Sequence, residues 1–423
     1  MSAAAQSQAA FLKGESHKKH PGVTNLKTLR LPDELQTAAR SIIHTRVAQL
    51  TDRSRSLTNF LWSKKRAVED STLRQKAVSL EKELWEKAME KRGDMDEELL
   101  EDRIKKKVFS ELRKTTYHWT PMKYDEELAV VYMAARLAGG YAAVRRAMNE
   151  ILKRDPSFAP QTLLDFGSGL GTVVWSVGKT PDATLTAFSC EHERIVFVFT
   201  SFSEPHIKQV YFRQFLPVSP KVQFDVVAAA FTLSELLNAK DREEAVMTLW
   251  RKTSSYLVLV ENGTKDGHQM LMEARATLLK KQDKIVHDSR PASVFAPCPH
   301  ELTCPKLALK PTTPCNFQQK YTPLPLPGHN ERQTEKFSYL IVSRTEPAEA
   351  EGEGVDWARL IAPVQSRSRH VHCRMCCPDG RLQHLVVTAR KQSRDVYRCA
   401  RSSDWGDQLP IIQRVDDDRS DSE

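Results

Sequence analysis

The hydrophobic positions along this chain change their spacing near residue 160, from a helical period to short apolar runs. Between residues 33 and 155, apolar residues recur three and four positions apart, as at Leu35, Ala39 and Ile42. This spacing places them on one face of an α-helix. We therefore expect a helical N-terminal domain over residues 33–158.

From residue 161 onward, apolar runs of strand length alternate with stretches of helix length. The expected strands are Thr162–Phe166, Phe224–Phe231 and Tyr256–Glu261, and the expected helices begin at Thr172, Asp241 and His268. Strands and helices that alternate at this spacing form a doubly wound parallel sheet, which binds its ligand at the carboxyl ends of the strands. We expect a Rossmann-like α/β domain over residues 159–290.

A glycine-rich turn, Gly167-Ser168-Gly169-Leu170-Gly171, follows the first expected strand. Glycines two residues apart allow a tight turn and a close approach of the backbone to a ligand. The preceding Asp165 suits a nucleoside that carries a positive charge. We therefore predict that Asp165, Gly167, Ser168 and Gly169 bind a cofactor, a weak signal by itself that the later strands support.

Seven of the eight cysteines lie between residues 298 and 399, in two groups. The first group is Cys298, Cys304 and Cys315, and the second is Cys373, Cys376, Cys377 and Cys399. Thiolates from separated segments bind a soft metal or an iron–sulfur cluster, whose binding free energy orders loops with little apolar surface. We predict a β-rich, metal-bound module over residues 291–412 that completes the sheet. A disulfide framework and a scatter of buried thiols are the alternatives, and the lack of a visible secretory signal peptide disfavours the first of them.

The charge of the chain favours an anionic partner. The formal net charge is +9, and nine Arg and Lys residues between Gln365 and Arg401 compare with two acids, Asp379 and Asp395. This basic strip could neutralise the phosphates of a nucleic acid, and a solvated surface is the alternative. No apolar run approaches the roughly 18 residues of a membrane-spanning helix, so we expect no membrane partner.

The two ends of the chain are polar. Residues 1–32 carry several basic residues and few acids, which suits either an organellar presequence or a disordered tail. Residues 413–423 are rich in Asp and Ser, and we expect an acidic disordered tail there.

The segment Leu163–Gly171 resembles the first motif of class I S-adenosylmethionine-dependent methyltransferases. Four further segments narrow the resemblance: Phe212–Pro217, Thr232–Leu236, Leu257–Thr264 and Ala296–His300. Over roughly residues 57–410, the chain is similar to the methyltransferase-like assembly factors of the mitochondrial small ribosomal subunit. This resemblance implies S-adenosylmethionine binding, a [4Fe–4S] cluster, and association with the rRNA and proteins of that subunit, as a monomer in the mitochondrial matrix.

The resemblance also implies a set of cluster ligands. These would be Cys298, Cys304 and Cys315, with a fourth cysteine from the second group. We choose Cys376, although Cys373 and Cys377 lie close enough in sequence to compete for the same position. Zinc is the alternative metal.

The chain departs from the methyltransferase pattern between Gly171 and Glu204, a stretch that looks too short for the helix, strand and helix expected there. Glu191 is the acidic residue near the end of a plausible second strand, Thr184–Ser189, and we assign it the contact to the cofactor ribose. We expect S-adenosylmethionine to bind weakly to such a pocket.

The chain lacks the usual catalytic motifs at the end of the second long strand. The residues there, Ala230–Glu235, contain neither an Asn/Asp-Pro-Pro-aromatic turn nor a cysteine nucleophile. We predict no catalytic residues, and interpret Glu235 as a charge stabilised at the start of a helix. The predicted function is therefore rRNA binding by a methyltransferase-like fold. An active rRNA methyltransferase and a zinc-stabilised RNA-binding protein are the alternatives.

Overall fold

The computed structural model describes residues 17–44, 49–90, 97–116, 120–177, 185–190, 207–219, 221–280, 288, 290–344 and 357–410. The predicted acidic tail and Glu191 lie outside these residues. Within them, every helix is too short or too polar to span a bilayer.

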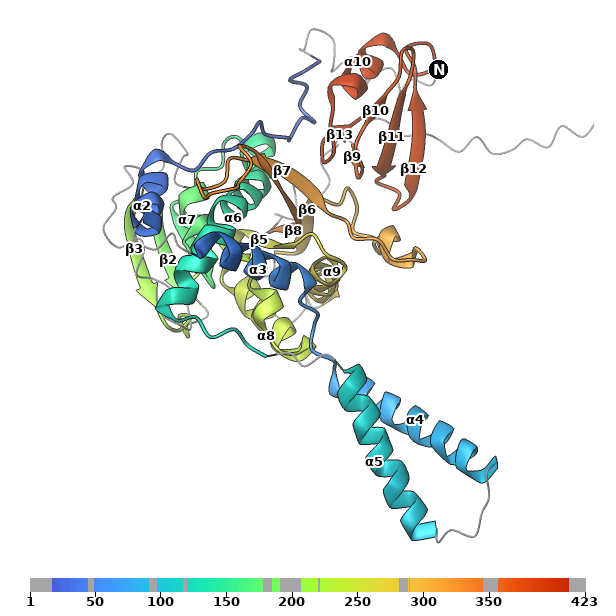
Figure 1. Ribbon diagram of the computed structural model, residues 1–423. Coiled ribbons are helices and arrows are strands. Elements are labelled where there is room, and N and C mark those ends of the chain that lie inside the picture. The colour runs from blue at the N-terminus through green and yellow to red at the C-terminus, as the bar shows by residue number, and fades with distance from the viewer. Residues whose placement is uncertain are drawn as a thin grey trace, which may run out of the picture.

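An eight-stranded sheet forms the centre of the molecule (Figure 1). Its strands are β1 (Thr162–Phe166), β2 (Leu185–Cys190), β3 (Ile207–Arg213), β4 (Phe224–Ala230), β5 (Thr253–Asn262), β6 (Ala292–Ala296), β7 (Phe317–Tyr321) and β8 (Gln333–Arg344). They lie in the order β3-β2-β1-β4-β5-β8-β6, and β7 also pairs with β8. The five strands β1 to β5 are parallel, whereas β8 runs antiparallel to β5, β6 and β7. The sheet is therefore mixed and not wholly parallel as predicted, because loops without a crossover α-helix join β6, β7 and β8.

Helices cover both faces of this sheet. On one face pack α6 (Glu126–Arg154) and α7 (Thr172–Val177), and on the other α8 (Ala239–Arg251) and α9 (Lys265–Lys280). Each face of the sheet has its own hydrophobic core, and alternate residues of β4 belong to different cores. Val226 and Ala228 face α6, and Val227 and Ala229 face α8 and α9. This alternation follows from the two-residue period of a strand.

The predicted N-terminal helices form two groups. The helices α2 (Asp33–His44) and α3 (Leu50–Ser63) share a buried core with α6. The helices α4 (Asp70–Glu90) and α5 (Glu97–Thr115) pack on each other and project from the body as a hairpin (Figure 1). The hairpin exposes Val78, Leu99 and Phe109.

Two adjacent glycines, Gly139 and Gly140, lie within α6 and do not interrupt it. A Cβ atom at Gly139 would collide with the carboxylate of Glu335 on β8. Glycine therefore allows α6 to lie close to the sheet, and tertiary contact outweighs its weak helix propensity.

A second, five-stranded sheet forms a separate C-terminal module. It contains β9 (Ala358–Leu360), β10 (Gln365–Ser366), β11 (Val371–Cys376), β12 (Leu382–Val387) and β13 (Gln408–Leu409), and is covered by α10 (Arg394–Ser402). Residues 291–412 were predicted as one module that completes the sheet. Strands β6 to β8 do complete the central sheet, whereas β9 to β13 form the second one.

Residues 17–32, which we expected to belong to a presequence or disordered tail, pack partly against this module. The ring of His20 is buried and its Nε2 lies 2.8 Å from Ser403 Oγ. The backbone N–H of Thr24 donates a 2.8 Å hydrogen bond to Asp407 Oδ1. These contacts join the first described segment to the last strand.

A buried carboxylate, Glu150 on α6, links the module to the central sheet. It accepts hydrogen bonds from Arg359 of β9 at 2.8 and 3.1 Å, from Arg146 at 3.0 Å, and from the Tyr339 hydroxyl of β8 at 2.9 Å. Burial alone would raise the pKa of Glu150, but the two guanidinium groups lower it to about 2. The carboxylate is therefore ionised in the folded protein at neutral pH.

Replacing Glu150 with Gln should lower the free energy of unfolding by about 3–5 kcal/mol, because two buried guanidinium groups lose their counter-charge. Urea unfolding followed by tryptophan fluorescence measures the effect. The matched control is Glu127→Gln on the same helix, whose ion pair with Arg53 is exposed and should contribute less than about 1 kcal/mol. Equal effects of the two substitutions would contradict this role of Glu150.

Glu150 also predicts acid sensitivity. Its pKa is depressed from 4.5 to about 2, so its stabilising contribution is complete above about pH 4.5 and is lost as the pH falls toward 2. In Glu150→Gln, the stability should depend less steeply on pH over this range, measured as urea midpoints at a series of pH values. A slope equal to that of the wild type would exclude the assignment.

Candidate functional site

The four predicted metal ligands line one small cavity between the central sheet and the C-terminal module. Cys298 lies in the loop after β6, and Cys304 precedes the short 3-10 helix η4 (Pro305–Ala308). Cys315 precedes β7, and Cys376 ends β11 of the second sheet. Residues 78 positions apart in the chain, Cys298 and Cys376, therefore meet at the boundary between the two sheets.

Strand alternation separates Cys376 from its two competitors. Cys373, Met375 and Cys377 face the core of the C-terminal module, where all three are fully buried. Cys376 is on the opposite face of β11 and lines the cavity. Cys373 and Cys377 line no part of that cavity, and neither does Cys399, which lies in the same core.

The cavity is a poor environment for free thiolates. Burial raises the pKa of Cys298 to about 11 and that of Cys315 to about 12, and neighbouring thiols add to both shifts. Burial likewise raises the pKa of Cys376. Without a bound cation these groups are thiols, and binding of a metal would release their protons.

Cationic and imidazole groups surround the same thiols. Arg359 lines the cavity and donates a 2.9 Å hydrogen bond to the carbonyl of Pro297. The Nε2 atoms of His300 and His268 lie near the sulfurs of Cys376 and Cys304. Within the described ranges, no group of three or more His, Cys, Asp or Glu side chains is arranged so that it could hold a metal ion. Four thiols line the cavity, three from the connection between β6 and β7 and one from β11, and a set of four thiolates is the usual ligand set of an iron–sulfur cluster.

The glycine-rich turn has the backbone shape that the sequence indicated. Gly167, Gly169 and Gly171 adopt φ angles of 68°, 47° and 65°, in the left-handed region that favours glycine. A Cβ atom at Gly167 would collide with the side chain of Thr232, which follows β4. Asp165 and Ser168 are buried beside the turn. Glu191, the expected ribose contact, cannot be placed because it lies outside the described residues.

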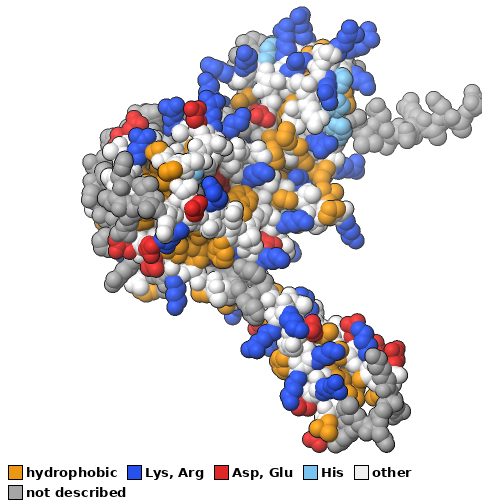
Figure 2. All heavy atoms as spheres, viewed as in Figure 1, with side chains coloured by type: hydrophobic (Ala, Val, Ile, Leu, Met, Phe, Trp, Pro, Cys, Tyr) orange, Lys and Arg blue, Asp and Glu red, His pale blue; other side chains and the backbone are white. Residues whose placement is uncertain are grey.

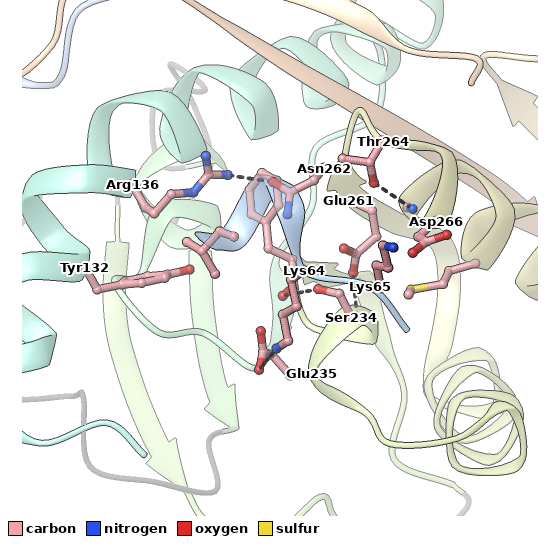
Figure 3. A pocket seen from close by; sticks show the side chains of 14 residues that line it. Lys64, Lys65, Tyr132, Arg136, Ser234, Glu235, Glu261, Asn262, Thr264 and Asp266 are labelled. Atoms are coloured by element: carbon pink, nitrogen blue, oxygen red, sulfur yellow. Dashed lines mark hydrogen bonds and ion pairs between the residues drawn. The ribbon is translucent and has the colours of Figure 1, made fainter. Parts of the chain in front are cut away.

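A second pocket lies at the carboxyl ends of β4 and β5 (Figure 3). Lys64 and Lys65, which follow α3, reach into it from one side, and Lys64 Nζ lies 2.8 Å from Glu235 Oε2. From the other side, Arg136 of α6 donates a 3.1 Å hydrogen bond to Asn262 Oδ1. The N-terminal helices thus supply cations that cover the edge of the sheet where a doubly wound fold binds ligands.

Glu261 is the most unusual group in this second pocket. It is 1 % exposed, and burial raises its pKa to about 7. Its Oε1 accepts a 3.3 Å hydrogen bond from the backbone N–H of Ser234. Glu261 was expected only as the last residue of a strand. Its position, an acid at the end of an apolar strand and before Asn262-Gly263, was the signal that could have identified it.

The basic strip of the C-terminal module is fully on the surface. All nine Arg and Lys residues between Gln365 and Arg401 are exposed. Figure 2 shows blue side chains and the pale blue histidines gathered over the module. His372 and His384 stack with their ring centroids 5.2 Å apart. This surface can attract phosphates.

Comparison with known proteins confirms the resemblance. The family model described as "Mitochondrial small ribosomal subunit Rsm22" matches residues 126–410. The human ribosome assembly protein METTL17, mitochondrial, is 46% identical over 415 residues, which cover 96% of this chain and 88% of the relative. The Rsm22-cox11 tandem protein 2, mitochondrial, of Schizosaccharomyces pombe is 26% identical over 330 residues, covering 68% of this chain and 43% of the relative.

A solved structure, the magnesium protoporphyrin IX methyltransferase of Synechocystis PCC 6803 with bound SAH, matches with 12% identity and a TM-score of 0.29. The match covers 58% of this chain and 97% of that one. The strand order of the sheet, β3-β2-β1-β4-β5 followed by an antiparallel strand, is itself that of the class I methyltransferase fold. Because the family model covers most of the chain and the human relative matches almost all of it, the chain belongs to the Rsm22 family of mitochondrial small ribosomal subunit proteins.

Proposed function

We propose that this protein is an assembly factor of the mitochondrial small ribosomal subunit, which works in the mitochondrial matrix as a monomer and binds rRNA without transferring methyl groups. Its family and its human relative, a mitochondrial ribosome assembly protein, support the ribosomal role. In this proposal the methyltransferase-like body, which is the central sheet with its helices, binds the subunit through its shape. The C-terminal module binds rRNA through its positive charge.

The proposal of a non-catalytic role is based on the carboxyl ends of β4 and β5, which the segment after α3 covers. A methyl acceptor would have to enter this edge, where the segment after α3 lies in the described structure. That segment is fixed by several contacts, including Arg66 with Glu273 at 2.7 Å and Glu69 with the backbone N–H of Ala239 at 2.9 Å. Opening the edge would break these interactions together.

An active rRNA methyltransferase is the second candidate, and Glu261 favours it. A buried carboxyl group with a pKa of about 7 is suited to accept a proton near neutral pH. We prefer the non-catalytic role because Lys64 and Arg136 occupy the approach to Glu261.

We further propose that Cys298, Cys304, Cys315 and Cys376 hold one [4Fe–4S] cluster, with zinc as the alternative metal. When bound, the cluster would supply a covalent cross-link between the central sheet and the C-terminal module, and a redox-active group. The observation that supports the proposal is that all four thiols line one cavity.

S-adenosylmethionine is the proposed ligand of the glycine-rich turn, with Asp165, Gly167, Ser168 and Gly169 as contacts and Glu191 on the ribose. The left-handed glycines support the proposal. Thr232 occupies the space beside Gly167, which is consistent with the weak affinity that we expect.

The cluster proposal predicts that replacing Cys298, Cys304, Cys315 or Cys376 with Ser removes most of the iron from anaerobically purified protein. Iron analysis and visible absorption measure the effect. The matched controls are Cys377→Ala and Cys399→Ala, which alter buried thiols in the core of the module and should retain the iron. Tightly held zinc in a colourless wild type, or iron retained in all four Ser variants, would contradict the cluster.

The cofactor proposal predicts that Gly169→Val abolishes S-adenosylmethionine binding measured by calorimetry, because a branched side chain is strained at φ 47° and distorts the turn. The control is Gly328→Val, at φ 74°, where an added Cβ would meet no heavy atom within 4 Å; it carries similar backbone strain outside the site. Tight binding by the wild type would show that the pocket is not weakened.

The same variant separates the two candidate functions. In cells that lack the protein, Gly169→Val should restore mitochondrial translation more fully than Cys304→Ser at matched expression. The opposite order, together with loss of a specific rRNA methyl group, would establish the enzyme.

The RNA proposal predicts that replacing Arg390, Lys391 and Arg394 with Gln weakens association with the small subunit. A plot of the logarithm of the association constant against the logarithm of the salt concentration has a negative slope, and each lost phosphate contact makes it shallower by about 0.7–0.9. The difference in affinity between the variant and the wild type is therefore greatest at low salt. The control neutralises three exposed cations of the body, Lys221, Lys240 and Arg251. Equal effects of the two triple variants would exclude the module as the specific contact.

A further inference from the structure

Two buried histidines touch two of the four thiols of the cysteine cavity. The Nε2 atom of His300 lies 3.3 Å from Cys376 Sγ, and the Nε2 atom of His268 lies 3.7 Å from Cys304 Sγ. The exposed fractions of these histidines are 8% and 2%. Both distances are within the range of hydrogen bonds to sulfur.

Each contact joins two different segments. His268 belongs to α9 of the body, and Cys304 to the loop between β6 and β7. His300 belongs to the same loop, and Cys376 to β11 of the C-terminal module. His268 therefore lies at the boundary between α9 and the β6–β7 loop, and His300 at the boundary between that loop and the C-terminal module.

The helix α9 also supports the second histidine through its backbone. Arg275 is buried and donates a 2.7 Å hydrogen bond from Nη2 to the carbonyl oxygen of His300. It lies seven residues after His268, two turns along the same face of α9. One face of α9 thus fixes both histidine contacts.

The direction of these hydrogen bonds follows from metal binding. A cysteine that ligates a metal is a thiolate, which can accept a hydrogen bond but cannot donate one. The imidazole must then donate its Nε2–H to the sulfur. Outer-sphere donors of this kind orient the ligand and stabilise negative charge on it.

We infer that His268 and His300 are positioning residues for the cluster, which donate hydrogen bonds to the thiolates of Cys304 and Cys376. This inference rests on the proposed cluster. Reduction adds negative charge to a cluster and its sulfurs, so the two donors raise its reduction potential. They also slow the loss of iron, because each holds a ligand in place.

The test compares His268→Leu and His300→Leu with the wild type, all as full chains reconstituted with iron and sulfide under anaerobic conditions. Three quantities are measured: bound iron, the midpoint reduction potential, and the rate of iron release to a chelator. We expect normal bound iron, a more negative potential, and release that is about tenfold faster for each variant. The double variant should combine both shifts, because the two hydrogen bonds reach different sulfurs.

Two further variants separate hydrogen bonding from packing. His300→Gln retains a side-chain N–H donor and should recover part of the potential that His300→Leu loses. His20→Leu alters a fully buried histidine that contacts Ser403, and should leave the potential of the cluster unchanged.

The outcomes distinguish this inference from the cluster proposal. A wild type that takes up no cluster contradicts both. A loaded wild type whose Leu variants keep its potential and release rate contradicts the role of the histidines alone. A folded His300→Leu variant without iron also overturns the positioning role, because it identifies the imidazole as a direct ligand.

Discussion

The placement of the C-terminal module depends on one buried ionic contact, the carboxylate of Glu150 with Arg146 and Arg359. All three side chains are at most 1% exposed. Charges removed from water in this way are tolerated only when each has its partners, so the contact admits one relative position of helix and strand. Arg359 then extends the constraint to the cysteine cavity, because it also binds the carbonyl of Pro297, the residue before Cys298.

The strands of the central sheet could be predicted because their signal is local. An apolar run such as β4 or β5 indicates a buried strand from its own residues. The antiparallel orientation of β8 depends on how the intervening loops turn, and the helix α6 stays continuous through Gly139 because of Glu335, almost two hundred residues later in the chain. Such long-range causes leave no pattern in the nearby sequence.

The candidate sites likewise depend partly on local sequence signals and partly on long-range contacts. The clustering of cysteines indicated a shared location, and the two-residue period of β11 places Cys376 in the cavity and Cys373 and Cys377 in the core of the module. In contrast, Lys64 follows α3 and Arg136 lies in α6, neither of which carried a catalytic motif, and only the folded chain brings the two residues to the end of β5. Residue type indicates which chemistry a side chain can perform, whereas the topology of the fold decides which side chains meet at one site.

The hydrogen bonds of Thr24 to Gly406 and Asp407 have a consequence for biosynthesis. The partners are separated by more than 380 residues, so the edge of the second sheet closes only after nearly the whole chain has been synthesised. The central sheet needs no residue beyond β8 and can form earlier. Any chaperone that retains the segment around Thr24 during translation therefore delays the closure of the second sheet.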